Sequence, residues 1–244
     1  MPSKPFLSVV VPVYNEEMMI GETVRRVEAY FQFIEKPGEI IIVNDGSTDT
    51  TAAKLAELSA GRKTLLQVLT VSQNSGKGYA SRLGVLAAKG EYVLLTDADL
   101  STPMKEVEKL LTALEAGTDV AIGSRALRAA GCDVQQSFKR RVSSRIFNGI
   151  VQTLVLPGLF DTQCGFKLFT ARAARELFSR QTVPGFSFDV EILFLARTLG
   201  LSIRESPVMW RQGSSSRVHL FRDSTRMVRD LFLIKKTHRA GREK

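Results

Sequence analysis

Two aspartates stand at the end of an apolar run that is typical of a buried strand. In the stretch LLTDADLS, residues 94–101, a single alanine separates Asp97 from Asp99. If the strand continues through both, their side chains point to the same side of the sheet. Carboxylates this close repel each other unless a cation or a well-hydrated surface lies between them, and hard oxygen ligands favour Mg²⁺ or Mn²⁺. We therefore predict a divalent-cation site at Asp97 and Asp99.

A third candidate, Asp45, ends another strand-like run in VNDGSTD. At the end of a strand it could accept hydrogen bonds from the base or ribose of a nucleotide. Its neighbours Gly46, Ser47 and Asp49 are of the types that form turns and cap helices, so we expect structural roles for them. Turn chemistry is also the alternative for the aspartate pair, because Asp is frequent where strands end.

The glycine-rich stretch NSGKGYAS, residues 74–81, resembles a phosphate-binding loop only superficially. Gly78 follows Lys77 where the Walker A pattern requires Ser or Thr, and Ser81 stands where the dinucleotide-binding pattern requires its last glycine. We expect a flexible loop that brings Lys77 to an anionic group.

Arginines are concentrated in the second half of the chain. Arg125 follows Gly-Ser at the end of a predicted strand, residues 139–141 read KRR with Arg145 one turn later, and Arg211 and Arg217 flank QGSSS. Guanidinium groups bind phosphate oxygens in a bidentate manner, so these positions favour an anionic ligand.

The charge of this 244-residue chain is unevenly distributed. Residues 1–120 hold 12 basic and 16 acidic side chains, a net charge of −4, whereas residues 121–244 hold 22 and 9, a net charge of +13. This asymmetry indicates one partner reached through a cation and a second partner that is itself anionic. A solvated basic surface is the alternative.

Cysteine usage and hydropathy limit the compartment. Cys132 and Cys164 form no CxxC pair, which suits a reducing cytosol, and Cys164 is expected to be a packed thiol. The sequence contains no uninterrupted run of about 18 apolar residues, so it predicts no transmembrane helix. Residues 138–156 and 218–236 are amphipathic with Arg and Lys beside the apolar stripe, a pattern typical of core packing and also of a helix on a membrane surface.

The remaining pattern predicts an α/β fold. Over residues 1–120, four strand-like runs alternate with helical patterns, which indicates a mainly parallel sheet with its ligand site at the carboxyl ends of the strands. We expect one domain, 1–244, whose second half elaborates the first. The predicted strands are 8–14, 39–45, 65–71, 91–99, 119–125 and 203–210, and the predicted helices are 16–34, 48–60, 78–89, 138–156, 169–179, 187–199 and 218–236.

The motifs VPVYNEE, VNDGSTD, GKG, TDADLS and GSR, in this order, resemble the family 2 glycosyltransferases of GT-A fold. Within that family the chain is similar to the polyprenyl-phosphate sugar synthases, namely dolichyl-phosphate mannose synthase and dolichyl-phosphate β-glucosyltransferase. DTQCGFKLF (161–169) and FDVEILF (188–194) resemble the glucosyl enzyme most. The likeness extends over about residues 6–236.

The resemblance implies a set of site residues. Nucleotide contacts are implied at Pro12, Tyr14, Glu16, Val43 and Asp45, a metal and diphosphate motif at Asp97, Ala98 and Asp99, and phosphate contacts at Arg125, Arg211 and Arg217. We add Lys77 on the donor side and Ser124, Arg141 and Arg145 on the acceptor side. Asp97, Asp99, Arg125 and Arg211 are the expected catalytic residues. Leu100-Ser101-Thr102 departs from the glutamine-containing continuation of many mannose synthases, so no third metal ligand is assigned.

The implied reaction is inverting, metal-dependent transfer of a hexose from a nucleotide sugar, UDP-glucose before GDP-mannose, to polyprenyl or dolichyl phosphate. It would take place on the cytoplasmic face of a membrane. A phosphate acceptor is already ionised and needs no strong base. One alternative is transfer to a soluble or cell-surface sugar hydroxyl, with Asp189 or Glu191 as general base. A basic nucleic-acid-binding protein is the non-enzyme alternative; no helix-turn-helix, RRM or KH signature supports it, so no nucleic-acid partner is expected.

Overall fold

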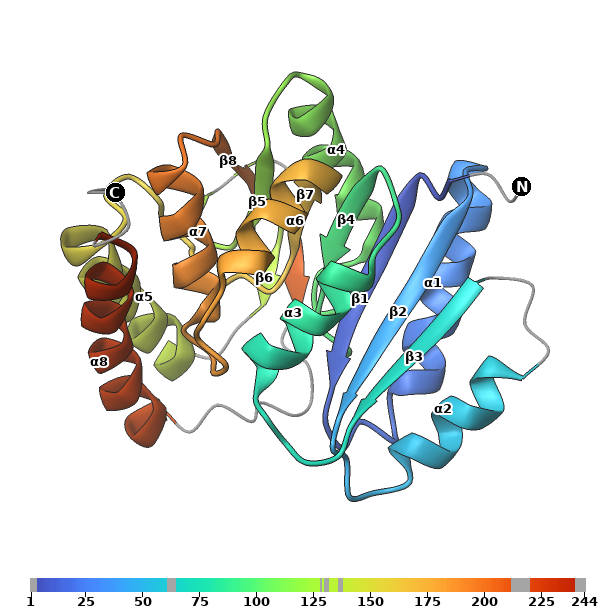
Figure 1. Ribbon diagram of the computed structural model, residues 1–244. Coiled ribbons are helices and arrows are strands. Elements are labelled where there is room, and N and C mark those ends of the chain that lie inside the picture. Colours follow the sequence, from blue (N-terminus) through green and yellow to red (C-terminus); the bar gives the residue numbers. More distant parts are fainter. Residues whose placement is uncertain are drawn as a thin grey trace.

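A computed structural model describes residues 4–60, 65–127, 129, 132–135, 138–211 and 220–239. Seven strands form the central sheet in the order β3-β2-β1-β4-β7-β5-β8 (Figure 1). Their bounds are β1 Leu7–Val13, β2 Gly38–Asp45, β3 Leu65–Val71, β4 Tyr92–Leu95, β5 Val120–Ser124, β7 Lys167–Thr170 and β8 Ile203–Pro207. A small second sheet pairs β6 Val134–Gln135 with β9 Trp210–Arg211.

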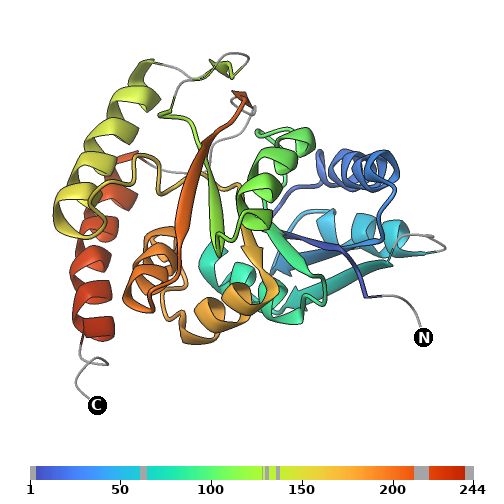
Figure 2. The same ribbon diagram turned by 90° about the horizontal axis from the view of Figure 1, so that it is seen from above.

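Helices cover both faces of the central sheet (Figures 1 and 2). Two buried apolar clusters result: α1, α2 and α4 contribute to one, and α3, α5, α6, α7 and α8 to the other. Successive strand residues supply opposite clusters, as Val9 and Val10 do in β1. The helices are α1 Ile20–Ile34, α2 Thr51–Ser59, α3 Lys77–Ala87, α4 Val107–Glu115, α5 Phe138–Leu154, α6 Ala171–Arg180, α7 Phe188–Thr198 and α8 Leu220–Arg239, with a 3₁₀ turn Met104–Glu106 before α4.

The predicted parallel arrangement of the first four strands is confirmed. β1 lies between β2 and β4 and is parallel to both, with Val9 opposite Ile40 on one side and Leu94 on the other. β3 adds to β2 in the same direction. Strands buried on both faces need apolar residues at successive positions, which explains the run Val9–Val10–Val11 and the run Ile40–Ile41–Ile42.

One strand was not predicted. Residues 169–179 were expected to be helical, but Lys167–Thr170 form β7 and α6 begins only at Ala171. Thr170 ends the strand and caps the helix, because its Oγ1 accepts a hydrogen bond from the backbone N–H of Ala173 at 3.2 Å. β7 is antiparallel to both of its neighbours, β4 and β5. Its first residue therefore lies at the edge where the neighbouring strands end.

The two amphipathic helices, α5 and α8, lie side by side at the end of the molecule away from β3 (Figures 1 and 2). Each apolar stripe is divided between core and surface. The buried members are Val151, Met227, Leu231 and Ile234, and the exposed members are Val142, Ile146, Phe232 and Leu233. Among the helices of the described ranges, none combines the length and hydropathy that crossing a bilayer requires.

Candidate active site

The carboxyl edge of the central sheet brings the predicted site residues together. β2 ends at Asp45, β4 ends two residues before Asp97, and β5 ends directly before Arg125. Because β7 runs the other way, its first residue, Lys167, joins them at this edge, opposite Leu95 of β4. Ends of parallel strands are the usual place for ligand binding in such sheets.

The aspartate pair lies in a turn and not in an extended strand, so the alternation argument for its geometry is wrong. β4 ends at Leu95, the backbone N–H of Leu100 donates to the carbonyl of Asp97 at 3.1 Å, and Leu100 has a φ of 42°. The Asp99 carboxylate accepts hydrogen bonds from the N–H and Oγ of Ser101, at 2.9 and 2.6 Å. Turn chemistry thus accounts for part of the motif.

The Asp97 carboxylate lies among cations. Its Oδ1 accepts a hydrogen bond from Nζ of Lys77 at 2.5 Å. Burial by itself would raise the pKa of Asp97. The positive charges of Lys77, Lys167 and Arg125 lower this pKa by more than burial raises it, so it lies below its ordinary value. Asp97 is therefore ionised at neutral pH.

Lys77 is bonded to a carboxylate of the chain itself, Asp97, and its contact with a donor phosphate remains a prediction. The expected flexible loop is wrong at this residue, because Lys77 is the first residue of α3. Burial lowers the pKa of Lys77, but the negative charges of Asp97, Asp189 and Asp99 outweigh burial, so its pKa is raised. Its ammonium is bonded to Asp97, and the charges of Asp189 and Asp99 act on it from farther away. The described ranges hold no group of three or more His, Cys, Asp and Glu side chains arranged to bind a metal ion.

Asp45 organises the loop that leads into α3, whose first residue is Lys77. Its carboxylate, buried at the end of β2, accepts hydrogen bonds from the backbone N–H groups of Ser75 and Gly76 at 2.9 and 2.8 Å. Gly76 has a φ of 104°, a conformation that favours glycine, and precedes the first residue of α3. A nucleotide contact at Asp45 remains a prediction.

The structural roles expected for the neighbours of Asp45 are confirmed. Asp49 Oδ1 accepts from the N–H of Thr51 at the start of α2, Ser47 Oγ accepts from the N–H of Asn15, and Gly46 has a φ of 67°.

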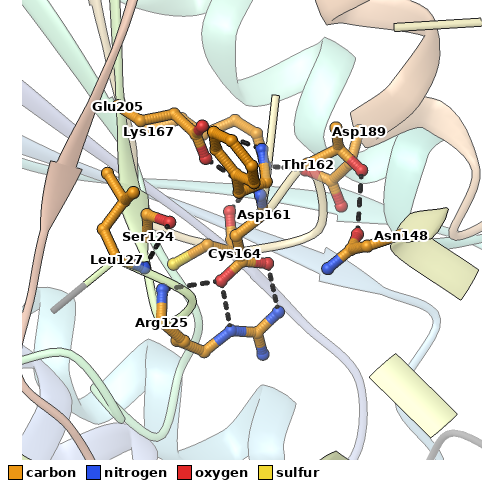
Figure 3. A network of polar contacts seen from close by, with 11 residues as sticks. Ser124, Arg125, Leu127, Asn148, Asp161, Thr162, Cys164, Lys167, Asp189 and Glu205 are labelled. Atoms are coloured by element: carbon orange, nitrogen blue, oxygen red, sulfur yellow. Dashed lines mark hydrogen bonds and ion pairs between the residues drawn. The ribbon is translucent and has the colours of Figure 1, made fainter. Parts of the chain in front are cut away.

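Arg125 forms a bidentate ion pair with Asp161 (Figure 3). Its Nε donates to Asp161 Oδ2 and its Nη2 to Oδ1, both at 2.7 Å, and its backbone N–H also donates to Oδ2. The guanidinium carbon lies 5.5 Å from the centre of the Trp210 ring. Glu205 fixes Asp161 in turn, because it accepts from the Asp161 N–H at 2.9 Å. Arg125 is therefore held rigidly by a buried carboxylate.

Lys167 and Asp189 form a second buried ion pair (Figure 3). Lys167 Nζ donates to Asp189 Oδ1 and to the Cys164 carbonyl, each at 2.5 Å. Burial raises the pKa of the Cys164 thiol to about 11, which confirms that it is a packed thiol. One candidate base of the soluble-acceptor alternative, Asp189, is thus bound to a lysine.

The other candidate base, Glu191, is fully buried and serves a loop. It accepts hydrogen bonds from the N–H and Oγ1 of Thr182 and from the N–H of Val183, and Nε2 of His238 lies 2.7 Å from its Oε1. Burial raises the pKa of Glu191, but these hydrogen bonds, that of His238 first, hold it below its ordinary value. His238, to which the sequence assigned no role, joins α8 to this network.

The other proposed contact residues divide by exposure. Pro12 near the end of β1, and Tyr14 and Glu16 after it, are partly exposed. The side chains of Val43, Ala98 and Ser124 are buried. Val43 as a whole is 0% exposed and lies between Pro12 of β1 and Leu69 of β3, so its nucleotide contact remains a prediction. Arg211 is exposed, and its N–H donates to the Ser101 carbonyl at 2.9 Å, which places it beside the aspartate turn. The side chains of Arg141 and Arg145, and the whole of Arg217, lie outside the described residues.

Sequence reasoning assigned no role to Asp161, Gly165 or Lys167, which belong to the segment DTQCGFK (161–167). The sequence signal that could have revealed this segment is the lysine that begins the apolar stretch KLFT, because a lysine buried in a strand requires a buried partner for its charge.

Comparison with known proteins places this arrangement in a family. The model of Glycosyl transferase family 2 matches residues 8–178. Dolichyl-phosphate beta-glucosyltransferase of Dictyostelium discoideum is 35% identical over 94% of this chain and 74% of its own length. The human protein of the same name is 36% identical over 96% of this chain and 76% of its own length.

Solved structures agree on the fold. Glucosyl-3-phosphoglycerate synthase of Mycobacterium tuberculosis, in complex with Mn²⁺ and UDP-glucose, superposes with a TM-score of 0.68 at 20% identity. The superposition covers 94% of this chain and 78% of that one. The predicted GT-A fold is confirmed, as is the resemblance to the glucosyl enzymes. The nucleic-acid-binding alternative is set aside. The chain is a glycosyltransferase and belongs to Glycosyl transferase family 2.

Proposed function

We propose that this chain transfers glucose from UDP-glucose to a polyprenyl phosphate such as dolichyl phosphate, with inversion at the anomeric carbon. The dolichyl-phosphate beta-glucosyltransferases that share about a third of its residues suggest both glucose and the lipid phosphate. UDP-glucose is bound in the solved glucosyl-3-phosphoglycerate synthase of the same fold. The chemistry of the site supports the same choice.

The observation that carries the proposal is that both candidate general bases, Asp189 and Glu191, are already bound to other groups of the protein. A sugar hydroxyl must lose a proton during transfer, and a general base has to reach it. Asp189 is bound to Lys167, and Glu191 is buried and occupied by Thr182, Val183 and His238. A lipid phosphate carries its negative charge already, so its oxygen can attack without either residue.

A divalent cation, Mg²⁺ or Mn²⁺, fits the donor set at the aspartate turn. Two carboxylates, Asp97 and Asp99, are a suitable protein contribution for an ion that takes its other ligands from a diphosphate and water. Lys77 on Asp97 shows that this carboxylate already attracts positive charge. When bound, the ion would offset the charge that develops on the diphosphate leaving group.

The chain supplies further positive charge of its own. Lys77 is protonated at neutral pH and is the cation closest to Asp97, so it can donate a hydrogen bond to a donor phosphate placed there. Arg211 is exposed beside the aspartate turn, and Arg125 contributes its field from its place on Asp161. Each charge-assisted hydrogen bond to a phosphate contributes about 1.5–3 kcal/mol.

The reaction is tested directly by product partitioning. With labelled UDP-glucose, polyprenyl phosphate and Mn²⁺, we expect label to enter the organic phase, and much less label from GDP-mannose. The product should be a β-linked glucosyl phosphate by NMR, because one in-line displacement inverts an α-linked donor. Preferential labelling from GDP-mannose, or of a water-soluble sugar, would contradict the proposal.

The lipid acceptor requires the protein to work at a membrane surface, on its cytoplasmic face, and α5 and α8 carry the apolar side chains for this contact. Phe232 is 59% exposed and Ile146 is 61% exposed. Exposed apolar side chains flanked by basic residues insert shallowly among anionic headgroups.

We therefore expect salt-sensitive binding to liposomes that contain anionic lipid. Phe232→Asp should weaken it about tenfold or more, because the substitution replaces an inserted ring with a charge that the headgroups repel. Co-sedimentation measures the binding. Phe33→Asp is the matched control, since Phe33 is 66% exposed on α1, at the other end of the sheet (Figure 1). Equal weakening by both substitutions, or none by Phe232→Asp, would argue against docking through α8.

A further inference from the structure

Gly165 lies directly against the carboxylate of Asp97. A Cβ atom built on Gly165 would stand 2.2 Å from Asp97 Oδ2, 2.7 Å from Cγ and 2.9 Å from Oδ1. Real Cβ atoms do not approach other atoms this closely. The φ of Gly165 lies outside the left-handed region, so its backbone conformation would accept a side chain. The obstacle to a larger residue is the Asp97 carboxylate itself.

The segment that carries Gly165 is anchored on both sides. The residues before and after it, Cys164 and Phe166, are each 1% exposed. The Cys164 carbonyl accepts from Lys167 Nζ, and the Phe166 carbonyl accepts from the Gly123 N–H at 2.9 Å. Further back, Asp161 is paired with Arg125. The backbone at Gly165 therefore has little room to withdraw.

Lys77 also contacts the Asp97 carboxylate. Gly165 contacts the Oδ2 end of the carboxylate, and Lys77 Nζ bonds Oδ1. The main chain of Asp97 is held as well, by the hydrogen bond from the Leu100 N–H. An added methyl group at Gly165 would thus have to displace the carboxylate, whose side chain is 40% exposed and can turn toward solvent, out of the orientation in which Lys77 holds it.

We propose that Gly165 is a positioning residue. Its missing side chain leaves the space in which Asp97 holds the orientation needed to bind the cation and diphosphate of the donor. This inference rests on the proposed function for its meaning in catalysis. The contact that carries it, Gly165 on Asp97, is independent of which sugar or acceptor is used.

The test compares two glycine-to-alanine variants. In Gly165→Ala, the new methyl meets Asp97; in Gly21→Ala, on α1, an ideal Cβ has no neighbour within 4 Å. Mn²⁺ binding in the presence of UDP is measured from the paramagnetic resonance signal of free Mn²⁺. We expect Gly165→Ala to weaken binding about tenfold or more and Gly21→Ala to leave it unchanged. Wild-type affinity in Gly165→Ala would overturn the inference.

A second measurement needs neither metal nor substrate. Overpacking should lower the urea midpoint of unfolding of Gly165→Ala by about 0.5 M. In an Asp97→Ala background the carboxylate is gone, so the same substitution should cost much less, and a Gly165→Ala protein that fails to fold should be rescued. An equal loss in both backgrounds would assign Gly165 a purely backbone role and overturn the inference.

The outcomes separate the two claims. Suppose that the wild type transfers no glucose, but that Gly165→Ala lowers the urea midpoint much more when Asp97 is present than when it is absent. The proposed function then fails and the positioning role stands. If glucose is transferred and the unfolding losses are equal in both backgrounds, the positioning role fails alone.

Discussion

Asp97→Asn is expected to lower the rate of glucosyl transfer by at least about a thousandfold. The substitution keeps the shape of the side chain and removes the negative charge that Lys77, Lys167 and Arg125 surround. Preorganised charge at a leaving group is commonly the largest single contribution to catalysis, and loss of one such group costs about two to three orders of magnitude. Loss of the proposed cation ligand adds to this cost. Initial rates with labelled UDP-glucose measure the effect.

The matched control is Asp119→Asn. Asp119 also accepts hydrogen bonds from a cation, Arg172, and from Ser202, but it precedes β5 at the opposite edge of the sheet. We expect its turnover to remain near that of the wild type. Asp99→Asn should act in the same direction as Asp97→Asn. If Asp97→Asn kept near-normal turnover, with or without EDTA, the aspartate turn would have no part in the reaction.

Arg125→Ala is expected to destabilise the fold by about 3–5 kcal/mol. Asp161 is 1% exposed, and removal of its partner would leave a buried carboxylate without a counter-charge. The surviving folded protein should also transfer glucose roughly ten- to hundredfold more slowly, because Asp97 loses part of its positive surroundings. Urea unfolding measures the first effect and transfer rates measure the second.

An exposed pair of the same residue types gives the control. Arg172 bonds Asp119 at 2.5 Å, but its side chain is 66% exposed. Arg172→Ala should therefore cost no more than about 1 kcal/mol. Similar losses in the two variants would show that burial does not set the energy of the Arg125 pair.

The pH dependence of Arg125→Ala has a definite sign. In the wild type, burial by itself would raise the pKa of Asp161. Arg125 lowers this pKa by more than burial raises it, so it lies below the ordinary value of 3.8. The pair thus contributes its full stability above about pH 4 and loses it as the pH falls through the folded-state pKa. Without the Arg125 guanidinium, burial is the largest influence left on the pKa of Asp161 and raises it, opposed only by the backbone N–H of residue 125 and the charge of Lys167. The difference in stability between wild type and variant should therefore shrink from pH 7 toward pH 4.

The sequence predicted the parallel half of the fold well because that half follows local rules. Each strand from β1 to β4 is an apolar run followed by a polar turn, and each crossover is a helix of ordinary periodicity. β7 was missed because four residues, KLFT, run straight into a helix without a turn residue between them. Their strand state is set by pairing with β4 and β5, which no local pattern reveals.

The sequence predicted where the site residues lie in the fold, but not which side chains they bind. Asp45, Asp97 and Arg125 do lie at one edge of the sheet, as strand ends must in a parallel arrangement. Their partners are far away in sequence: Asp161 is 36 residues from Arg125, and Lys77 is 20 residues from Asp97. The turn at Asp97–Asp99 also ended the strand earlier than the apolar pattern suggested. Long-range ion pairs and the exact end of a strand depend on tertiary packing, which spacing alone does not encode.

The direction of β7 makes the stretch between β5 and β7 an excursion that begins and ends at one edge of the sheet. The chain leaves the sheet at the end of β5 and returns at the same edge on the adjacent strand, where Lys167 lies opposite Ile122. An excursion whose two ends are neighbours can change in length and content without altering the strands that flank it. Exchange of this stretch between relatives is therefore expected to change the acceptor while residues 1–120 stay the same, provided that Asp161, Gly165 and the buried residues of α5 such as Val151 are retained.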